Sequence, residues 1–492
     1  MGNAMFPWFQ LCGPCSWSSA VVSSAACSLE DASRLSPPWG LPVIGASYIV
    51  ARYENPWEAF SALSRLYGSV FQLCLGSRTC LVVSSPDALR QVLLGKTAND
   101  FVDRPDFLRY HAIFRGDRNL SLALCDWSSK HRRRRELTHS WLHPRAGSDS
   151  RARLGRCVRQ ELSALLEHFD ATHGQAVNVR AALRLSAANV FFDFICSKRF
   201  SQDDKTFLEV VRLYDAVFQE LFQGFALDFM PWLKFVHSKK LNHLRQQAVC
   251  ISRLTTEIVD ERIQKGCNKD EDLVDLLLLS MDDGAPDSLD RQEVEVVLDD
   301  LLGGHSVVAN LWLWALYILA SYGEEAQKKL AEEARQSLEK DVADEDQQLP
   351  YAEATLYEIL RMVNSPIIPH ICSKDTTLQG YCISKGTMVM FNTHDLNFST
   401  DLWEDPWSFR PERFLSKGML RKPAHFVPFG TGRRACLGDG LVRAILVPGM
   451  AALCQRFQIG LGPGQPPADL KQQRTRVIFD RDPLLTFVPC IS

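Results

Sequence analysis

A run of 22 residues without a charged side chain, Leu301–Tyr322, restricts this 492-residue chain more than any other feature. Its length would suffice for a membrane span, which needs about 20 mainly apolar residues. However, Gly303, Gly304, His305, Ser306 and Asn310 suit a lipid-facing surface poorly. Asp290 and Glu293 precede it with the spacing of a capping box, in which Asp replaces the usual Ser or Thr. The pattern predicts one buried helix of about 33 residues and about 50 Å, with a large helical core around it.

The remaining patterns predict a mainly α protein with small β-sheets. Helical periodicity dominates from about residue 150 to residue 340. Strand patterns occur within Ser69–Ser85 on both sides of Gly76, within Thr376–Met390 and near Leu484–Val488. The chain length suggests about three domains, but no repeat or change of composition divides the sequence. We therefore expect one domain over residues 37–492, which begins with a stiff Pro- and Gly-rich connector.

Composition excludes several classes of protein. The net charge is −3, from 55 Lys and Arg against 58 Asp and Glu. This balance excludes a strongly basic nucleic-acid-binding protein and an acidic disordered chain. Fifteen cysteines, an odd number in so long a chain, exclude a small disulfide scaffold. Most of them are expected to be ordinary buried thiols, so the question is whether one has a chemical role.

The first 36 residues form a leader of different character, with no charged side chain among the first 29. A signal peptide begins with basic residues, which this leader lacks. The leader is therefore either a weak, atypical membrane-targeting segment or a disordered or alternative one. Its CGPC sequence, Cys12–Cys15, is similar to a thioredoxin redox motif. That motif requires a flanking strand and helix, and we interpret this copy as coincidence.

The segment FGTGRRACLG, Phe429–Gly438, carries the strongest chemical signal. It imitates a dinucleotide fingerprint, but no clear strand precedes it, so that interpretation is weak. The better interpretation centres on Cys436, because cysteine thiolate is a ligand of haem iron. Glycines at 430, 432 and 438 let the backbone approach a flat ligand closely. Arg434 is placed to pair with an anionic group of that ligand, and the helix expected at Leu441–Leu453 would favour a thiolate at its N-terminus.

This segment resembles the haem-binding signature of the cytochrome P450 monooxygenases, F-x-x-G-x-R-x-C-x-G. All five fixed positions match, at Phe429, Gly432, Arg434, Cys436 and Gly438. The resemblance covers about Pro37 to the C-terminus. It implies the cytochrome P450 fold, in which a long central helix crosses a buried haem b, with Cys436 as the axial ligand of the iron.

Two further motifs support the same resemblance. Glu358 and Arg361 match the family's E-x-x-R helix pair, and Arg413 of FRPERF matches the arginine that locks this pair. A carboxylate buried between two guanidinium groups is satisfied only when all three are present. We therefore expect these three residues to be structural.

Other residues depart from the family pattern. The family has a Trp and, four residues later, an Arg that contacts a haem propionate. Here Trp127 is followed at that spacing by His131, with Arg132 next, while His370 matches the family's other basic propionate partner. The run His131–Arg135, HRRRR, is interpreted either as a solvated helix face or as a basic docking patch for an acidic flavoprotein reductase.

The long helix departs from the family pattern at positions that bear on the chemistry. The family's A/G-G-x-D/E-T is replaced by Gly303, Gly304, His305, Ser306 and Val307. The two glycines keep the helix thin where oxygen would bind. Valine cannot donate a hydrogen bond, so the proton delivery that the resemblance implies is in doubt. Ser306, His305 or ordered water could substitute.

Three segments narrow the resemblance to the spook and spookier group of arthropod cytochromes, which acts early in ecdysteroid synthesis. They are GGHSVVANL, RGDRNLSLALCDWSS and NTHDLNFSTDLWEDPWSFRPERF. The resemblance implies a sterol-like substrate downstream of 7-dehydrocholesterol. A series of aromatic residues fits either core packing or an apolar lid that touches the membrane and admits a sterol: Phe218, Phe222, Phe225, Phe229 and Trp232. The residues expected to line the substrate pocket are Phe107, Phe114, Leu120, Leu122, Leu302, Ile367 and Ile368.

The resemblance therefore implies a haem-thiolate monooxygenase that uses O2 and receives NADPH-derived electrons from a flavoprotein reductase. We expect it on the cytosolic face of the endoplasmic reticulum membrane, with no nucleic-acid partner. Two alternatives stay open. One is a haem-thiolate isomerase or dehydratase that acts on a peroxide without external electrons, and the other is a haem-bearing sterol binder without turnover.

Overall fold

The computed structural model describes residues 38–490 apart from 54, 202, 223, 268–270, 282–283, 285–286, 340–347 and 471–481. The leader and its Cys12–Cys15 pair lie outside the described residues. Helices dominate the described chain, which confirms the mainly α prediction. They are α1 (Ser47–Val50), α2 (Pro56–Tyr67), α3 (Pro86–Leu94), α4 (Leu108–Ile113), α5 (Ser129–Leu142), α6 (Asp149–Asp170), α7 (Arg180–Cys196), α8 (Lys205–Phe222), α9 (Ala226–Phe229), α10 (Ser238–Lys265), α11 (Leu273–Leu279), α12 (Arg291–Tyr322), α13 (Glu324–Glu339), α14 (Pro350–Val363), α15 (Thr393–Phe398) and α16 (Asp439–Arg456).

Short strands form small sheets beside the helices, as the sequence predicts. The largest sheet has the order β1-β2-β7-β4, with β1 and β2 antiparallel and β2 and β7 parallel. A second sheet has the order β10-β11-β3, and β5-β6 and β8-β9 are hairpins. The strands are β1 (Val70–Leu75), β2 (Arg78–Val83), β3 (Val177–Asn178), β4 (His370–Ile371), β5 (Thr376–Leu378), β6 (Tyr381–Ile383), β7 (Met388–Phe391), β8 (Leu415–Ser416), β9 (Met419–Leu420), β10 (Phe457–Leu461) and β11 (Leu484–Pro489).

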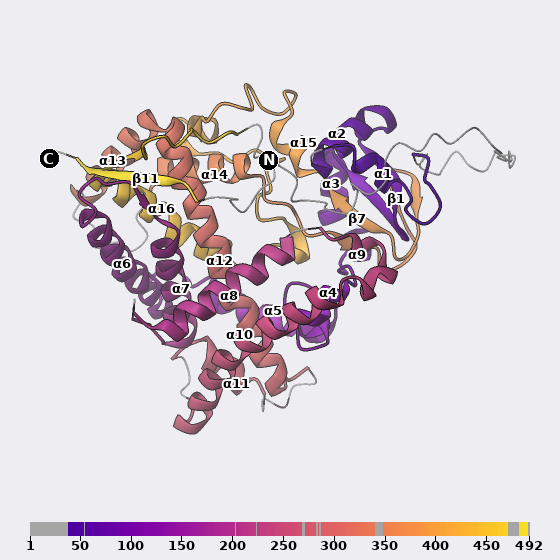
Figure 1. Ribbon diagram of the computed structural model, residues 1–492, viewed down its shortest axis with the longest axis horizontal. Coiled ribbons are helices and arrows are strands. Elements are labelled where there is room, and N and C mark those ends of the chain that lie inside the picture. Colours follow the sequence, from indigo (N-terminus) through magenta and orange to yellow (C-terminus); the bar gives the residue numbers. More distant parts are fainter. Residues whose placement is uncertain are drawn as a thin grey trace, which may run out of the picture.

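The helix α12 has 32 residues and runs through the middle of the molecule (Figure 1). It begins at a reciprocal capping box. The Asp290 carboxylate accepts from the Glu293 N–H at 2.8 Å, and the Glu293 carboxylate accepts from the Asp290 N–H at 2.9 Å. It ends at Gly323, where a Cβ atom would lie 2.8 Å from the Leu319 backbone. The structure thus confirms the long helix that the uncharged run predicts.

The surroundings of α12 explain why its sequence is so apolar. Helices α7, α8, α10, α14 and α16 pack against it. Gly449 of α16 permits a close approach, because a Cβ atom there would lie 2.8 Å from the Trp312 ring. Among the described residues, α12 alone is long and apolar enough to cross a membrane by length and composition, and most of its apolar window is buried inside the protein.

Figure 1 shows how the two kinds of structure are distributed. Helices α6, α7, α13 and α16 gather at one end of the molecule, and strands β1 and β7 lie with α1–α3 at the other. Helix α12 lies between these two parts of the molecule. The segments that carry the predicted site therefore come from distant parts of the chain and meet beside this helix.

A buried carboxylate ties α14 to the segment that leads into the cysteine loop. Glu358 accepts from Nε and Nη2 of Arg361, both at 2.8 Å, and from Nε of Arg413 at 3.0 Å. The side chains of Glu358 and Arg361 are fully buried. Arg361 also donates to the carbonyl oxygens of Asn397 and Pro406. Both oxygens of the Glu358 carboxylate are thus bound to side chains of the protein, which gives the residue a structural role.

We expect Glu358→Gln to lower the free energy of unfolding by about 3–5 kcal/mol, because it leaves two buried guanidinium groups without their counter-charge. Glutamine keeps the size of the side chain, so the change tests charge and hydrogen bonding. Denaturant unfolding of the purified protein measures the effect. Glu332→Gln is the control, since its partner Arg335 lies on the exposed face of α13. Equal midpoints for both variants would contradict this role of Glu358.

Candidate active site

The cysteine loop, Phe429–Gly438, lies between β9 and α16. Gly432 has φ +74°, and a Cβ atom there would lie 2.3 Å from the carbonyl oxygen of Leu93. Only glycine fits this combination of conformation and close contact. The N–H of Cys436 donates to the carbonyl oxygen of Phe429 at 2.8 Å and closes the loop. The glycines that the sequence singles out therefore hold Cys436 in a tight turn.

The sulfur of Cys436 has the properties of a metal ligand. Cys436 is exposed, whereas Cys125, Cys196 and Cys454 are buried thiols. The chain around the sulfur desolvates it and raises the pKa of the thiol, while the Gly438 N–H, which donates to Sγ at 3.3 Å, acts in the opposite direction. Such a thiol becomes a thiolate when a cation binds it, and a metal ion deprotonates a coordinating thiol.

Four basic side chains are buried together beside this loop: Arg104, His131, His370 and Arg434. Arg434 donates to the carbonyl oxygens of Val102 and Cys125 at 2.6 and 2.7 Å. Arg104 donates to the carbonyl oxygens of Ala123 and Ile368 at 3.1 and 2.9 Å. His370 Nδ1 lies 2.6 Å from the carbonyl oxygen of Phe101. We refer to these four residues as the basic cradle.

The charge of the basic cradle is not balanced by acidic side chains. Apart from a 3.3 Å contact between Arg434 and His131 Nε2, its side-chain hydrogen bonds run to backbone carbonyl oxygens, and within the described chain none of its side chains forms an ion pair with a carboxylate. Desolvation and the charge of Arg434 lower the pKa of Arg104 to about 9. A buried positive cluster of this kind suits a ligand with two anionic groups. The two propionates of haem have that charge, so the residues present fit the group.

His131 has a different role from the arginine expected at its position. Its Nε2 lies 2.9 Å from the carbonyl oxygen of Leu122 and therefore carries the proton. Desolvation and Arg434 lower the pKa of His131 to about 2, so the ring is neutral at pH 7. A neutral ring with its proton on Nε2 can only accept at Nδ1, and Nδ1 has no partner among the described residues. His131 holds the loop at Leu122, and an anion bound nearby would raise its pKa.

The side chains of the HRRRR run, His131–Arg135, lie in different environments. His131 and Arg134 are buried, and Arg134 donates to the carbonyl oxygens of Asn119 and Leu120. Arg132 is 69% exposed and pairs with Glu136, so the structure does not bring it to the basic cradle. Neither a uniformly solvated face nor one docking patch describes this run. Trp127 does lie at the cradle, because the guanidinium carbon of Arg434 is 5.4 Å from the centre of its ring.

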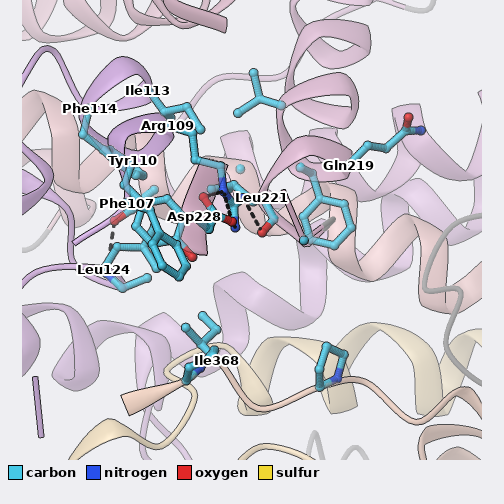
Figure 2. Close-up of a pocket in the computed structure, with 18 of the residues that line it drawn as sticks. Phe107, Arg109, Tyr110, Ile113, Phe114, Leu124, Gln219, Leu221, Asp228 and Ile368 are labelled. Atoms are coloured by element: carbon cyan, nitrogen blue, oxygen red, sulfur yellow. Dashed lines mark hydrogen bonds and ion pairs between the residues drawn. The ribbon is translucent and has the colours of Figure 1, made fainter. Parts of the chain in front are cut away.

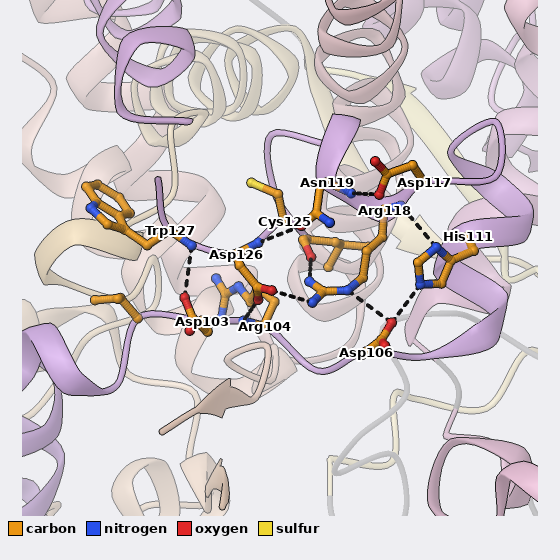
Figure 3. Close-up of polar contacts among 12 residues, drawn as sticks. Asp103, Arg104, Asp106, His111, Asp117, Arg118, Asn119, Cys125, Asp126 and Trp127 are labelled. Carbon is orange, nitrogen blue, oxygen red and sulfur yellow. Dashed lines mark hydrogen bonds and ion pairs between the residues drawn. The ribbon is translucent and has the colours of Figure 1, made fainter. Parts of the chain in front are cut away.

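The loop between α4 and α5 is fixed by Arg118. Its side chain donates to Asp126 at 2.6 Å, to Asp106 at 3.2 Å and to the carbonyl oxygen of Leu124 at 2.9 Å (Figure 3). The same loop supplies the carbonyl oxygens that Arg104 and Arg434 bind. Arg118 therefore stabilises the loop to which Arg104 and Arg434 of the basic cradle are bound.

A cavity of about 670 Å³ adjoins the basic cradle through Ala123, Ile368 and Pro369 (Figure 2). Apolar side chains of α2, α4, α8, α10, α12 and β7 contribute to its wall. Four of the seven residues expected in the pocket line it, namely Phe107, Phe114, Ile367 and Ile368. Leu120, Leu122 and Leu302 do not line it, and Leu122 and Leu302 pack in the core instead.

The aromatic series after residue 217 does not behave as one unit. Phe218 and Phe229 line the cavity, and Trp232 is exposed. Phe225 is half-buried and lies 5.2 Å from the guanidinium carbon of Arg109, as measured to the ring centre. The side chain of Phe222 lies outside the described residues. Both interpretations of the series therefore apply, each to different members.

Near the middle of α12, Gly303, Gly304 and Val307 line the cavity, whereas the polar pair between them, His305 and Ser306, does not. His305 and Ser306 are fully buried. The His305 ring lies edge-on to Tyr214 of α8, with ring centres 5.3 Å apart. The carbonyl oxygen of Ser306 accepts from Asn310, which also donates to Asp215 of α8. The structure thus directs this polar pair away from the cavity, because a helix that buries one face in the core cannot present all its residues to the cavity.

Sequence patterns missed the polar residues of the cavity. Arg109 forms a buried ion pair with Asp228 at 3.0 Å and donates to the carbonyl oxygen of Leu221 at 2.8 Å (Figure 2). Asp299 accepts from Ser252 at 2.9 Å, and burial raises its pKa to about 6. A lone arginine in the apolar segment FLRYHAIF and the two acidic residues directly before the uncharged run, Asp299 and Asp300, were the available signals.

Comparisons with known proteins agree with this geometry. The family model "Cytochrome P450" matches residues 35–485. The chain belongs to the cytochrome P450 family. Its activity class is therefore that of a haem-dependent monooxygenase.

Individual relatives extend over most of the chain. It is 33% identical to Cytochrome P450 307a1 of Drosophila melanogaster, over 86% of this chain and 83% of that protein. It is 29% identical to Cytochrome P450 1A1 of Opsanus tau, over 88% and 86%. A zebra fish cytochrome P450 solved with abiraterone has the same fold, with a TM-score of 0.75, 24% identity, and coverage of 89% of this chain and 100% of that one.

We expect Arg104→Gln to weaken haem retention by roughly tenfold or more, because one charge-assisted contact to a propionate contributes about 1.5–3 kcal/mol. Transfer of haem to an excess of apomyoglobin measures the release rate. Arg132→Gln is the matched control, since Arg132 lies outside the basic cradle. Identical release rates for the two variants would show that the cradle does not hold the anionic groups.

Proposed function

We propose that this cytochrome P450 oxidises a sterol-like apolar substrate with O2 and NADPH-derived electrons, in an early ecdysteroid step downstream of 7-dehydrocholesterol. The observation that carries the proposal is a large cavity with mainly apolar walls, which adjoins the basic cradle through Ala123, Ile368 and Pro369. Such a cavity suits a drug- or sterol-sized apolar ligand. The three segments similar to the spook and spookier group support the ecdysteroid step. We also propose that residues 37–492 form one haem domain.

Each part of the site has a distinct task in this proposal. Cys436 would hold the haem iron, and Arg104, Arg434 and His370 would bind its propionates, beside Trp127 and His131. When bound, haem supplies the activation of oxygen, which a thiolate ligand promotes. Phe107, Phe114 and Ile368 exclude water from the cavity and position an apolar substrate against α12. Gly303 and Gly304 form part of the cavity wall on α12, where a Cβ atom would meet Tyr214 at 3.4 Å and Phe191 at 3.0 Å respectively.

Electrons would come from NADPH through a flavoprotein reductase. The sequence contains no convincing nicotinamide or flavin motif, so a separate protein must supply them. Arg132 and Arg433 are exposed near the cysteine loop and could meet acidic side chains of that partner. These residues replace the full HRRRR run as the proposed docking contacts.

A second candidate function follows from Val307. This valine lies in the cavity wall where the family usually has a threonine. Without a hydroxyl donor there, an isomerase or dehydratase that acts on a preformed peroxide would need no proton delivery and no external electrons. The requirement for NADPH, reductase and O2 distinguishes the two candidates. A sterol binder without turnover would form no product under any of these conditions.

We expect purified protein with reductase, NADPH and O2 to convert labelled 7-dehydrocholesterol or its ketone products, and Cys436→Ala to abolish this activity. The wild type should show the red-shifted band of a thiolate-ligated haem in the reduced, carbon monoxide difference spectrum, and Cys436→Ala should lack it. Absence of that band in wild type would contradict the assignment of Cys436. A normal band without product would limit the failure to the substrate.

The proposed location is the cytosolic face of the endoplasmic reticulum membrane. Two groups of exposed apolar residues support a membrane contact: Trp39, Leu41 and Val43 before α1, and Trp232, Phe235 and Val236 after α9. The β1–β2 hairpin links the two groups, because Cys74 accepts from Ala46 and Ser77 donates to Phe229. Exposed Lys234 and Lys239 flank the second group and suit anionic lipids.

We expect Phe235→Ser to lower partition onto phosphatidylcholine vesicles by about tenfold, since burial of one Phe side chain contributes about 1.5–3 kcal/mol. Met419→Ser is the control, because Met419 is 65% exposed on the separate β8–β9 hairpin. Vesicle sedimentation measures the bound fraction, for the full chain and for a chain that starts at Pro37. If only the full chain binds, and Phe235→Ser has no effect, the leader alone makes the contact.

A further inference from the structure

Arg135 contacts the cysteine loop from the side of α5. Its Nη2 donates to the carbonyl oxygen of Ala435 at 2.7 Å. Ala435 directly precedes Cys436, so the guanidinium lies one peptide from the residue that bears the thiolate. Arg135 is half-buried, in contrast to Arg132 on the same helix. A charge in a partly desolvated position acts more strongly on its neighbours than one in water.

The charge of Arg135 is uncompensated. No ion pair with a carboxylate is found for it among the described residues, while Arg132 pairs with Glu136. Desolvation and Arg434 lower the pKa of Arg135 to about 10, which still leaves it protonated at pH 7. Asp439, an acidic residue whose charge acts on Cys436, is already paired with His143 at 2.6 Å and with Arg443 at 3.2 Å. The cysteine loop therefore experiences a net positive charge from this side.

We propose that Arg135 is a positioning residue that sets the electron affinity of the cysteine-ligated haem and fixes the loop through Ala435. This proposal rests on Cys436 as the ligand. Reduction adds one electron to the site, which becomes more negative by one charge, and no bond breaks. A nearby guanidinium stabilises the reduced form more than the oxidised form. Arg135 thereby favours acceptance of the first electron from the reductase.

The experiment compares Arg135→Gln, Arg135→Lys and Arg132→Gln as haem-loaded full-length proteins. Redox titration with mediator dyes, without reductase, gives the one-electron potential of each. Arg135→Gln should reduce the equilibrium constant of reduction about tenfold, equivalent to about 59 mV toward negative potential. Arg135→Lys keeps the charge and should stay close to wild type. Arg132→Gln should not change the potential, although it could slow reduction by the reductase if Arg132 contacts that partner.

The outcomes separate this proposal from the proposed function. A wild type without the thiolate band would refute Cys436 as the ligand. A normal band with equal potentials in wild type and Arg135→Gln would overturn the role of Arg135 alone. A potential in Arg135→Lys as low as in Arg135→Gln would assign the effect to loop geometry and overturn the role of charge. If Arg135→Gln fails to bind haem, Arg135→His is used in its place. The one-electron potential of Arg135→His is then measured as the pH is raised. Relative to wild type, this potential must fall as the introduced imidazole loses its proton.

Discussion

The burial of two guanidinium groups in one place is the constraint on which this structure depends. Arg104, Arg434 and the two histidines of the basic cradle lie together, and their hydrogen bonds run to carbonyl oxygens. Carbonyl dipoles hold the guanidinium groups in place but do not neutralise them. An anionic ligand removes this cost, so the protein reaches its full electrostatic balance only with haem or a similar dianion bound. The prosthetic group is thus part of the core as well as of the chemistry.

The same residues connect the cofactor to the substrate cavity. Arg104 binds the carbonyl oxygens of Ala123, Ile368 and Pro369, and all three residues line the cavity. Arg118 braces the other side of the loop through Asp106 and Asp126. A shift of the cradle would therefore move the cavity wall. The Glu358 carboxylate performs a comparable task farther away, since it fixes the chain that leads into the cysteine loop.

Local patterns predicted much of this arrangement. The capping box and the uncharged run identify α12, and the glycine positions and Cys436 identify the loop. Glu358, Arg361 and Arg413 were identified because each lies in a short motif that resembles one of the cytochrome P450 family. Arg104 was missed, and Arg135 was recognised only as part of the basic run His131–Arg135, because their contacts are with residues 264 and 300 positions away in sequence. His305 and Ser306 were expected at the cavity, but the rotation of α12 follows from its packing against α7 and α8, which sequence spacing does not determine.

The polar groups of the cavity also favour the apolar substrate proposed above. Arg109 donates hydrogen bonds to Asp228 and to the carbonyl oxygens of Glu220 and Leu221. Asp299 accepts from Ser252 and Thr255, and Asp300 accepts from Ser121 and from the backbone of Leu122. A polar ligand would have to break these internal bonds to gain its own, whereas an apolar ligand leaves them intact. Selection therefore depends mainly on shape and on apolar contact. Val307 extends this apolar wall to the glycines of α12, so any proton needed there must arrive by water or from the substrate rather than from that side chain.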